Sequence, residues 1–458
     1  MTQGTVHFVG IGGIGMSAIA RVLIARGETV TGSDTGDSPL LQQLRDLGAA
    51  VTIGHRAQNV NGAREVVVSS AIDPGNPEYA HAVASGIPVV RRGEMLRRIM
   101  NDTRGIAICG THGKTTTTAM TAAVLREAGI DASVVLGGMD VVSGVNAHHG
   151  SAPYFLTEAD ESDGSFALLD PSIAVVTNIE NDHLSSDAQL RALVESFKAF
   201  LSRMPADGTA ILGVDNPLSG SLASVPRRAR TVTFGLRPPA EVSAAKIHFD
   251  GLHSRFEAVA GGERLGPIEL HVPGTINIEN ALAAICAGRA LDLPFATISA
   301  GLRAFRGVRR RFEILAQTPR MTLVDDYAHH PTAVRATIAA ARRVAAGPLI
   351  VAFQPHRYSR TAYLASEFAN ALSGADEVYL VPVYAAAEPP MEGISERSIG
   401  EPLQASGTLV RYVKYVYDLR AALAENVPYG AFVLMLGAGN ITKVAADLAC
   451  DVNAAVSA

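Results

Sequence analysis

The segment 110–115 (GTHGKT) carries the residue types that hold nucleotide phosphates. It follows an apolar β-branched run and precedes an expected helix that starts near Thr115. Backbone N–H groups of such a loop, the Lys114 ammonium and the Thr115 hydroxyl suit phosphates and Mg²⁺. The standard phosphate-loop pattern has a longer spacer between its glycines, so the strict pattern fails while its chemistry is retained. The alternative is a helix start that happens to carry a lysine.

A second glycine loop, 10–15 (GIGGIG), also lies between an expected strand and an expected helix. Asp34 ends the next expected strand, 19 residues after Gly15. Glycines at these positions let backbone N–H groups approach a pyrophosphate at a helix N-terminus. The pattern indicates a diphosphate more firmly than it indicates NAD. A glycine turn that binds nothing is the alternative.

The elements around these loops predict an α/β fold. Hydrophobic residues make up 48% of the 458 residues and charged residues 18%, which allows several sizeable cores. Amphipathic helical stretches, such as 115–128 and 188–201, follow short apolar runs, which is typical of βαβ units in parallel sheets. The expected buried strands are 6–9, 66–69, 105–109, 173–177, 349–353, 377–381 and 431–436.

The chain divides into three expected domains. Residues 1–103 predict a Rossmann-like domain, residues 104–308 a phosphate-loop ATPase-type domain with a mostly parallel sheet, and residues 309–458 a second Rossmann-like domain. The run 305–311 (FRGVRRR) predicts a hinge, with a solvated basic loop as the alternative. Two diphosphate loops that open successive domains suggest two nucleotide-bearing ligands.

Charge and cysteine content limit the partners. The net charge of −5 argues against nucleic acid and anionic membrane surfaces. The three cysteines form no CxxC pair, so a reducing cytoplasmic location fits. We see no signal peptide at the start of the chain and no apolar run long enough for a membrane span. We expect a monomer or a weak homodimer.

Taken in order, several motifs resemble those of the Mur ligases of peptidoglycan synthesis. The motifs are GIGGIGMS at 10–17, GTHGKTTTT at 110–118, EADESDGSF at 158–166, NIENDHL at 178–184, NIENALAA at 277–284, DDYAHHP at 325–331, FQPHRYSRT at 353–361 and GAGN at 437–440. The resemblance implies an ATP-dependent ligase with a UDP-sugar domain, an ATP domain and an amino-acid domain. The implied substrates are UDP-N-acetylmuramate and L-alanine, joined through an acyl phosphate, with ATP and Mg²⁺ as cofactors.

The resemblance also assigns roles to individual residues in the ATP-binding region. The implied catalytic residues are Lys114, Glu158, His183, Arg311 and Asp326. The implied metal ligands are Thr115, Glu158 and His183. The implied ATP-binding residues are Gly110, Thr111, His112, Gly113, Lys114, Thr115, Thr116, Asn277, Asn280 and Arg311.

The other two substrates have implied sites as well. The sugar nucleotide would meet Gly12, Gly13, Ile14, Gly15, Met16, Ser17, Asp34, His55, Ser70 and Arg92. The amino acid would meet Tyr327, His329, His356, Arg357 and Arg360. Because this site draws on three domains, we expect domain closure during the reaction.

Each assignment has a plainer alternative. His183 alone would be a hydrogen-bonded turn histidine, and the acidic run 158–163 a solvated loop. Asn277 and Asn280 would cap the helix that follows them, and HRYSR would be an exposed basic turn. Ile276 stands where relatives usually have histidine. Sibling ligases for later amino acids use a carbamylated lysine, and the sequence leaves open whether Lys198 is modified in this way.

Three other functions remain open at this point. A murein-tripeptide recycling ligase would share these motifs and take a tripeptide in place of L-alanine. An NAD-dependent oxidoreductase would explain the first glycine loop and Asp34. A catalytically silent nucleotide sensor would keep both loops without turnover.

Overall fold

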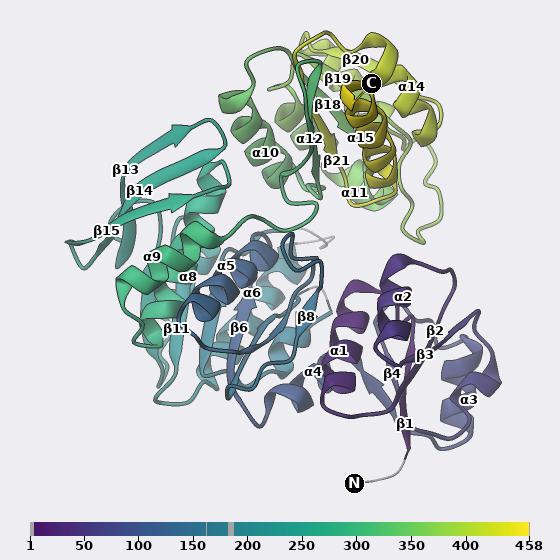
Figure 1. Cartoon of the computed structure of the whole chain (residues 1–458), viewed down its shortest axis with the longest axis vertical. Coiled ribbons are helices and arrows are strands. Elements are labelled where there is room, and N and C mark those ends of the chain that lie inside the picture. Colours follow the sequence, from purple (N-terminus) through teal and green to yellow (C-terminus); the bar gives the residue numbers. More distant parts are fainter. Residues whose placement is uncertain (1–3, 162, 182–186, 458) are drawn as a thin grey trace. The chain divides into compact units, whose positions relative to one another are not determined.

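The computed structural model describes residues 4–161, 163–181 and 187–457 (Figure 1). The chain forms two compact units. The first comprises Met1–Ala245, Glu257–Ile268 and Glu279–Phe305, and the second comprises Lys246–Phe256, Glu269–Ile278 and Arg306–Ala458. The last division between the units falls inside 305–311, the segment predicted as a hinge.

The first unit opens with a five-stranded parallel sheet in the order β3-β2-β1-β4-β5. This order is that of a Rossmann-like half, as the sequence predicted. Its strands are β1 (Thr5–Val9), β2 (Val30–Asp34), β3 (Ala50–Ile53), β4 (Ala63–Val68) and β5 (Val89–Arg91). Its helices are α1 (Ile14–Ala25), α2 (Pro39–Asp46), α3 (Pro77–Ala84) and α4 (Arg92–Met100).

A ten-stranded sheet follows, in the order β15-β14-β13-β12-β11-β10-β6-β9-β7-β8. Its pairs from β12 through β7 are parallel, and the short edge strand β8 is antiparallel to β7. The strands are β6 (Arg104–Cys109), β7 (Ser133–Val135), β8 (Ala147–His148), β9 (Tyr154–Glu158), β10 (Ile173–Val176), β11 (Thr209–Gly213), β12 (Arg230–Phe234), β13 (Val242–Asp250), β14 (His253–Ala260) and β15 (Glu263–Leu270). The helices are α5 (Lys114–Glu127), α6 (Asp187–Ser202), α7 (Pro217–Ser221), α8 (Thr275–Ala290) and α9 (Phe295–Ala304).

The second unit holds a six-stranded sheet in the order β16-β17-β21-β18-β19-β20, antiparallel only at β16. Its strands are β16 (Glu313–Gln317), β17 (Met321–Asp326), β18 (Leu349–Phe353), β19 (Glu377–Leu380), β20 (Leu409–Tyr412) and β21 (Ala431–Leu436). Its helices are α10 (Pro331–Val344), α11 (Tyr358–Tyr363), α12 (Ala365–Leu372), α13 (Arg397–Ala405), α14 (Leu419–Asn426) and α15 (Ile441–Ser457).

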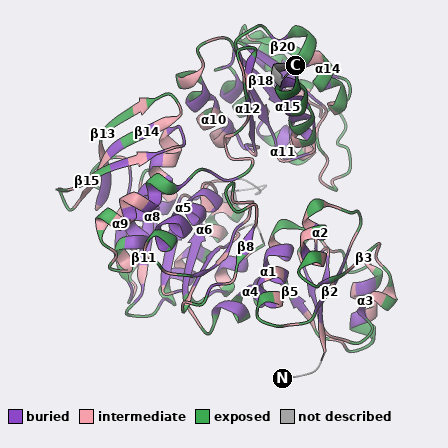
Figure 2. Ribbon diagram, viewed as in Figure 1, coloured by how far each residue is buried: buried purple, intermediate pink, exposed green. Residues whose placement is uncertain are grey.

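Continuous apolar runs form the central strands because helices cover both faces of these sheets. Strands β18 and β21 are buried at every position, as Figure 2 shows, and they have the predicted bounds. The α/β class and the three-domain architecture, with one sheet for each domain, are confirmed. Among the described residues, no helix combines the length and apolar character needed to cross a bilayer.

Several elements shift by one to three residues from their expected ends, and the start of α8 also changes how two site residues are placed. Helix α8 begins at Thr275, before both asparagines that the cap alternative places at its start. Asn277 and Asn280 therefore lie inside the helix, and the alternative that they cap it is wrong. The sequence misled here because Gly274, with φ of 94°, ends the preceding extended segment earlier than the asparagines suggest.

Candidate active site

The loop 110–115 connects the carboxyl end of β6 to the first turn of α5. Gly113 caps this helix with φ of 83°, a left-handed conformation that favours glycine. A Cβ at Gly113 would also overlap Oδ1 of Asn280. Glycine is therefore required here by backbone and by space, and it leaves the first amides of α5 open at the loop.

The two residues that follow β10 form hydrogen bonds with this loop. The sequence interpretation gave neither of them a role. Asn178 accepts a hydrogen bond from the His112 amide at 2.8 Å through its Oδ1 and one from the Thr111 amide at 3.0 Å through its backbone oxygen. Thr177 Oγ1 donates to the His112 carbonyl at 2.7 Å. The available signal was the position of the NIENDHL motif directly after a buried strand.

Lys114 Nζ is held among acceptors. It donates to the Gly110 carbonyl at 2.6 Å and to Glu161 Oε2 at 2.7 Å. Burial disfavours the ammonium, but the charges of Glu161 and Asp160 outweigh burial and raise the pKa of Lys114. The lysine is therefore a cation at neutral pH. Glu161 is a third residue that the sequence interpretation did not single out.

The hydroxyl of Thr115 and the carboxylate of Glu158 meet at the carboxyl edge of the sheet. Thr115 Oγ1 donates to Glu158 Oε2 at 2.9 Å. Glu158 ends β9, which pairs in parallel with β6 so that Ile108 lies opposite Glu158. A Cβ at Gly137 would overlap the Glu158 carboxylate, so this side chain occupies space that only glycine leaves.

Three more predicted ATP-binding residues, Thr116, Asn277 and Asn280, lie on helices α5 and α8. Thr116 is buried on α5 directly after Thr115. Asn280 Oδ1 accepts from Thr117 Oγ1 at 3.1 Å, which links α8 to α5 behind the loop. Asn277 Nδ2 donates to the Pro273 carbonyl at 2.7 Å. His112 Nε2 lies 3.3 Å from Glu180 Oε2.

The first glycine loop is held by β2. The amide of Gly12 donates to Asp34 Oδ2 at 2.8 Å, and the Gly10 amide donates to the Ser33 carbonyl, also at 2.8 Å. Gly13 caps α1, and Met16 and Ser17 are buried in its first turn. The carboxylate of Asp34 thus shapes the loop itself, a role that the dinucleotide pattern alone does not indicate.

His55, predicted on the sugar-nucleotide side, is part of a buried polar cluster. Its Nδ1 lies 3.0 Å from Ser33 Oγ and 3.3 Å from Glu78 Oε2. Burial would raise the pKa of Glu78, but hydrogen bonds from His7, Ser33 and Asn59 lower it to about 2. Glu78 is therefore an anion that positions His55.

Ser70 is exposed in the segment after β4. Arg92 begins α4 and lies close to the first loop, because a Cβ at Gly15 would come within 2.8 Å of Arg92 Nη1. Its Nη2 donates to Asp163 Oδ2 at 2.6 Å and lies 3.9 Å from Asp160 Oδ2. Arg92 therefore joins the first loop to the acidic segment 158–163.

A second link from the first loop to the central sheet comes from Asn146, which the sequence did not indicate. Its Nδ2 donates to the Ile14 carbonyl and to Ser17 Oγ, both at 2.8 Å. Asn146 is fully buried and stands just before β8. Because burial makes such hydrogen bonds costly to lose, the first turn of α1 is fixed against the edge of the central sheet.

In the second unit, the two aspartates that end β17 organise the edge of the sheet. Asp326 accepts hydrogen bonds from the Phe312 and Ala328 amides, both at 2.7 Å. Burial raises the pKa of Asp326 in spite of the nearby Arg311 guanidinium. Asp325 accepts from Thr442 Oγ1 at 2.6 Å, and burial raises its pKa to about 6.

Two arginines flank Tyr327, which follows these aspartates. The guanidinium carbons of Arg310 and Arg311 lie 4.8 Å and 4.9 Å from the centre of the Tyr327 ring. Arg310 also donates to the Gly437 carbonyl at 2.8 Å. The sequence interpretation selected only Arg311 from this pair, since spacing does not distinguish adjacent arginines.

The predicted amino-acid residues come together in a chain of rings. The His329 ring lies 5.0 Å from Tyr327 and 5.8 Å from His356, measured between centroids. His356 stacks on Tyr384 at 5.5 Å, and its Nδ1 lies 3.5 Å from Arg360 Nη1.

The two arginines of the HRYSR run differ. Arg360 is buried, which is not the exposed basic turn considered above. Arg357 is half-buried and lies 3.7 Å from Glu388. The GAGN segment is tied to the same edge, because Gln354 Nε2 donates to Asn440 Oδ1 at 2.8 Å.

Three further residues considered from the sequence are His183, Lys198 and Cys109. His183 lies outside the described residues. Lys198 Nζ forms an ion pair with Glu195 at 2.8 Å. Cys109 is a fully buried strand residue, and burial raises the pKa of its thiol, which disfavours the reactive thiolate.

Three family models match successive parts of the chain, one for each of the three sheets. Residues 5–104 match the Mur ligase family catalytic domain, residues 108–288 the Mur ligase middle domain, and residues 310–439 the Mur ligase glutamate ligase domain. The chain belongs to the Mur ligase family. As a Mur ligase, it carries the two glycine loops and the C-terminal His–Arg cluster in the family's order.

Relatives of this Mur ligase align along almost its whole length. A UDP-N-acetylmuramate–L-alanine ligase of Desulforamulus reducens is 43% identical, covering 97% of this chain and 96% of its own. One from Geobacter sp. strain M21 is 44% identical over 96% and 95%. The crystal structure of UDP-N-acetylmuramate–alanine ligase from Thermotoga maritima has a TM-score of 0.85 and 29% identity, covering 99% and 100%. A murein peptide ligase from Psychrobacter arcticus shares the fold, with a TM-score of 0.75 and 24% identity.

Proposed function

We propose that this chain is an ADP-forming ligase that joins the lactyl carboxylate of UDP-N-acetylmuramate to L-alanine in peptidoglycan precursor synthesis. The observation that carries the proposal is that two phosphate-type loops lie in one unit, where Arg92 ties the first loop to the acidic segment whose Glu161 accepts from Lys114 of the second. One loop suits a sugar nucleotide and the other suits ATP. Full-length relatives above 40% identity bear the name of this reaction, and nothing among them favours an NAD-dependent oxidoreductase.

The carboxylate substrate is a poor electrophile, so its activation needs phosphoryl transfer from ATP. Phosphoryl transfer depends mainly on positioning and on neutralising charge. The Lys114 ammonium and the amides at the start of α5 supply that neutralisation around the β/γ-phosphates. The resulting acyl phosphate is then attacked by the amine, and inorganic phosphate leaves.

The residues at Thr115 and Glu158 fit a magnesium ion. A threonine hydroxyl and a carboxylate oxygen 2.9 Å apart are hard oxygen donors, which Mg²⁺ prefers over nitrogen or sulfur. When bound, Mg²⁺ would neutralise phosphate charge during transfer. The second ligand set suggested by the resemblance includes His183 and stays a prediction.

The C-terminal unit supplies the amine side of the proposed reaction. Arg360 is buried beside His356, so it offers a fixed guanidinium to the carboxylate of the amino acid. Arg311 and Asp326 remain proposed ATP contacts. The ranges 1–103, 104–308 and 309–458 are the proposed sugar-nucleotide, ATP and amino-acid domains. Cytoplasmic location, roles in cell-wall biogenesis, cell shape and cell division, and a monomeric or weakly dimeric state belong to the same proposal.

A phosphate-release assay tests this function directly. The chain would be incubated with ATP, Mg²⁺ and UDP-N-acetylmuramate against a panel of amino acids and the murein tripeptide. We expect release with L-alanine and weaker release with glycine and L-serine, because one methyl group contributes about 1–3 kcal/mol of discrimination. Release with the tripeptide but not with L-alanine would instead identify a recycling ligase.

A further inference from the structure

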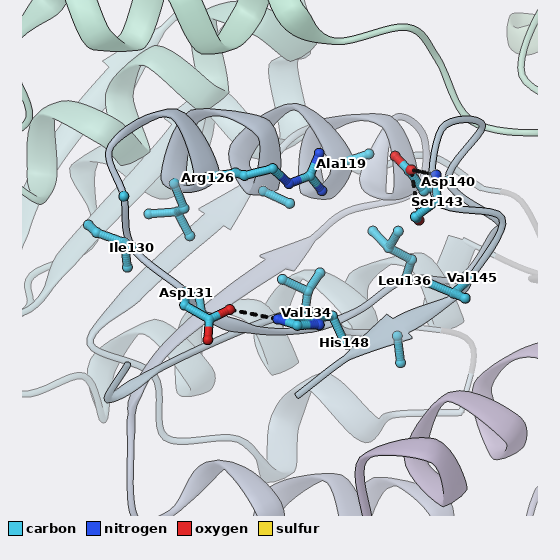
Figure 3. A pocket seen from close by; sticks show the side chains of 15 residues that line it. Ala119, Arg126, Ile130, Asp131, Val134, Leu136, Asp140, Ser143, Val145 and His148 are labelled. Atoms are coloured by element: carbon cyan, nitrogen blue, oxygen red, sulfur yellow. Dashed lines mark hydrogen bonds and ion pairs between the residues drawn. The ribbon is translucent and has the colours of Figure 1, made fainter. Parts of the chain in front are cut away.

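A pocket of about 430 Å³ lies between α5 and the β7–β8 edge of the central sheet (Figure 3). We call it the α5 pocket. Its volume falls within the range of small-molecule sites, roughly 300–1,000 Å³. None of its lining residues belongs to either glycine loop. The pocket therefore lies outside the site proposed above.

The walls of the α5 pocket are mostly apolar. Ala119, Ala122 and Leu125 line it from α5, while Leu136 and Ala147 line it from the opposite side. All five are buried. Small side chains on the helix leave the space open, and an apolar group placed there would be removed from water.

The two acidic residues at this pocket already have partners. Asp131 lies 2.6 Å from His148 Nε2 and accepts a hydrogen bond from the Ser151 amide at 2.8 Å. Asp140 accepts from the Ser143 amide at 2.7 Å. Asp131 is therefore paired with His148, and Asp140 is already hydrogen-bonded within its own turn.

Arg126 differs from these two carboxylates. It lines the α5 pocket, and its guanidinium makes no hydrogen bond or ion pair with any residue that the structure describes. Figure 3 shows its side chain extending along α5 over the pocket toward Ala119. A guanidinium beside an apolar cavity is complementary to a carboxylate that carries an apolar chain.

We propose that the α5 pocket binds a small amphipathic carboxylate, with its chain between Ala122 and Leu136 and its carboxylate on Arg126. Leu136 and Ala147, which line the pocket, lie at the two ends of the segment that connects β7 to β8. Other residues of this segment contact the proposed active site.

That connecting segment links the pocket to residues at both loops. Asn146 holds the Ile14 carbonyl, and Gly137 leaves the space that Glu158 fills. A ligand that displaces the segment would disturb the first turn of α1. We therefore expect the ligand to raise KM for the sugar nucleotide. This effect on KM rests on the proposed function, whereas the binding of the ligand to the pocket does not.

Calorimetric titration of the full chain with decanoate tests the binding. Decyltrimethylammonium, which has the same alkyl chain and the opposite charge, is the matched probe. We expect decanoate to bind at least about tenfold more tightly than the cation. Octanoate should bind about fourfold more weakly for each methylene removed. Equal binding of the two decyl probes would overturn the proposal, because it would show detergent-like association without charge recognition.

Two variants locate the site. Arg126→Gln should weaken decanoate binding about tenfold or more, whereas Arg228→Gln, at an exposed arginine outside the pocket, should leave it unchanged. Ala122→Phe should abolish binding by filling the cavity. Undiminished binding in Arg126→Gln would refute the proposal even if Ala122→Phe fails to fold, because Arg126 lies on the surface. Decanoate that binds through Arg126 without changing KM would overturn only the link to the active site.

Discussion

The Thr115 hydroxyl donates to the Glu158 carboxylate at 2.9 Å, although 43 residues separate them along the chain. Thr115 follows the loop after β6, and Glu158 ends β9. Because β6 and β9 are parallel neighbours, both side chains reach the same edge of the sheet. We expect Thr115→Val to lower kcat about 100-fold or more because a proposed Mg²⁺ ligand is lost. Thr115→Ser should retain most activity. Steady-state kinetics across a Mg²⁺ titration would measure both, and equal activity of the two variants would contradict the assignment.

Lys114 should be essential for turnover. Lys114→Ala removes the cation that faces the phosphates, and we expect ADP formation to fall at least about 100-fold. Lys414→Ala, at a lysine of the second unit that contacts the Tyr415 ring, is the matched control and should keep full activity. An ADP-release assay measures both variants. Undiminished ADP production in Lys114→Ala would count against the loop as the ATP site.

Asn146 is expected to position the sugar-nucleotide loop. Asn146→Ala leaves the Ile14 carbonyl without its buried donor, which costs about 1–3 kcal/mol. We expect KM for UDP-N-acetylmuramate to rise about tenfold while KM for ATP changes little. Asn61→Ala, at an exposed asparagine, should alter neither constant. A parallel rise in both KM values would show general destabilisation and not loop positioning.

The raised pKa of Glu279 predicts that the free energy of unfolding depends on pH. Burial, followed by the charges of Asp215 and Glu180, raises the pKa of Glu279 to about 7 from an ordinary 4.5. The folded state therefore binds the extra proton, and the free energy of unfolding falls as pH rises from 4.5 to 7, by up to about 3 kcal/mol. Glu279→Gln should remove this loss, so it should raise Tm at pH values above that window and leave it nearly unchanged below it.

Thermal unfolding at both ends of this pH range would test the effect. Glu263→Gln, at an exposed glutamate of the same unit, provides the control and should show no such pH dependence. A Glu279→Gln variant with the same pH profile as the original chain would show that this carboxyl group does not carry the shift.

Arg360 should determine affinity for the amino acid. Arg360→Lys keeps the charge but loses the planar fork that binds carboxylates, so KM for L-alanine should rise about tenfold or more. Arg357→Lys should have a smaller effect, because Arg357 is less buried than Arg360 and lies 3.7 Å from Glu388. Kinetics with L-alanine as the varied substrate would compare them. A larger effect at Arg357 would reverse the proposed roles.

Much of the fold could be predicted from the sequence because its strands are continuous apolar runs. Strands β18 and β21 have their predicted bounds, and the loops at Gly13 and Gly113 lie between strand and helix as expected. The start of α8 could not be predicted, since the helix begins among residues that also suit a cap. Of the candidate site, the motifs indicated Lys114 and Glu158 but not the residues that hold them.

The sequence by itself determined the order of the motifs, the α/β class and the chemical types at both loops, because these depend on short-range spacing and on local burial. Only the tertiary structure decided that Glu161 pairs with Lys114, that Asn146 holds α1, and that Arg126 faces an apolar pocket. The physical reason is that these contacts join segments from different elements. Their partners are set by strand order and packing, which no local pattern encodes.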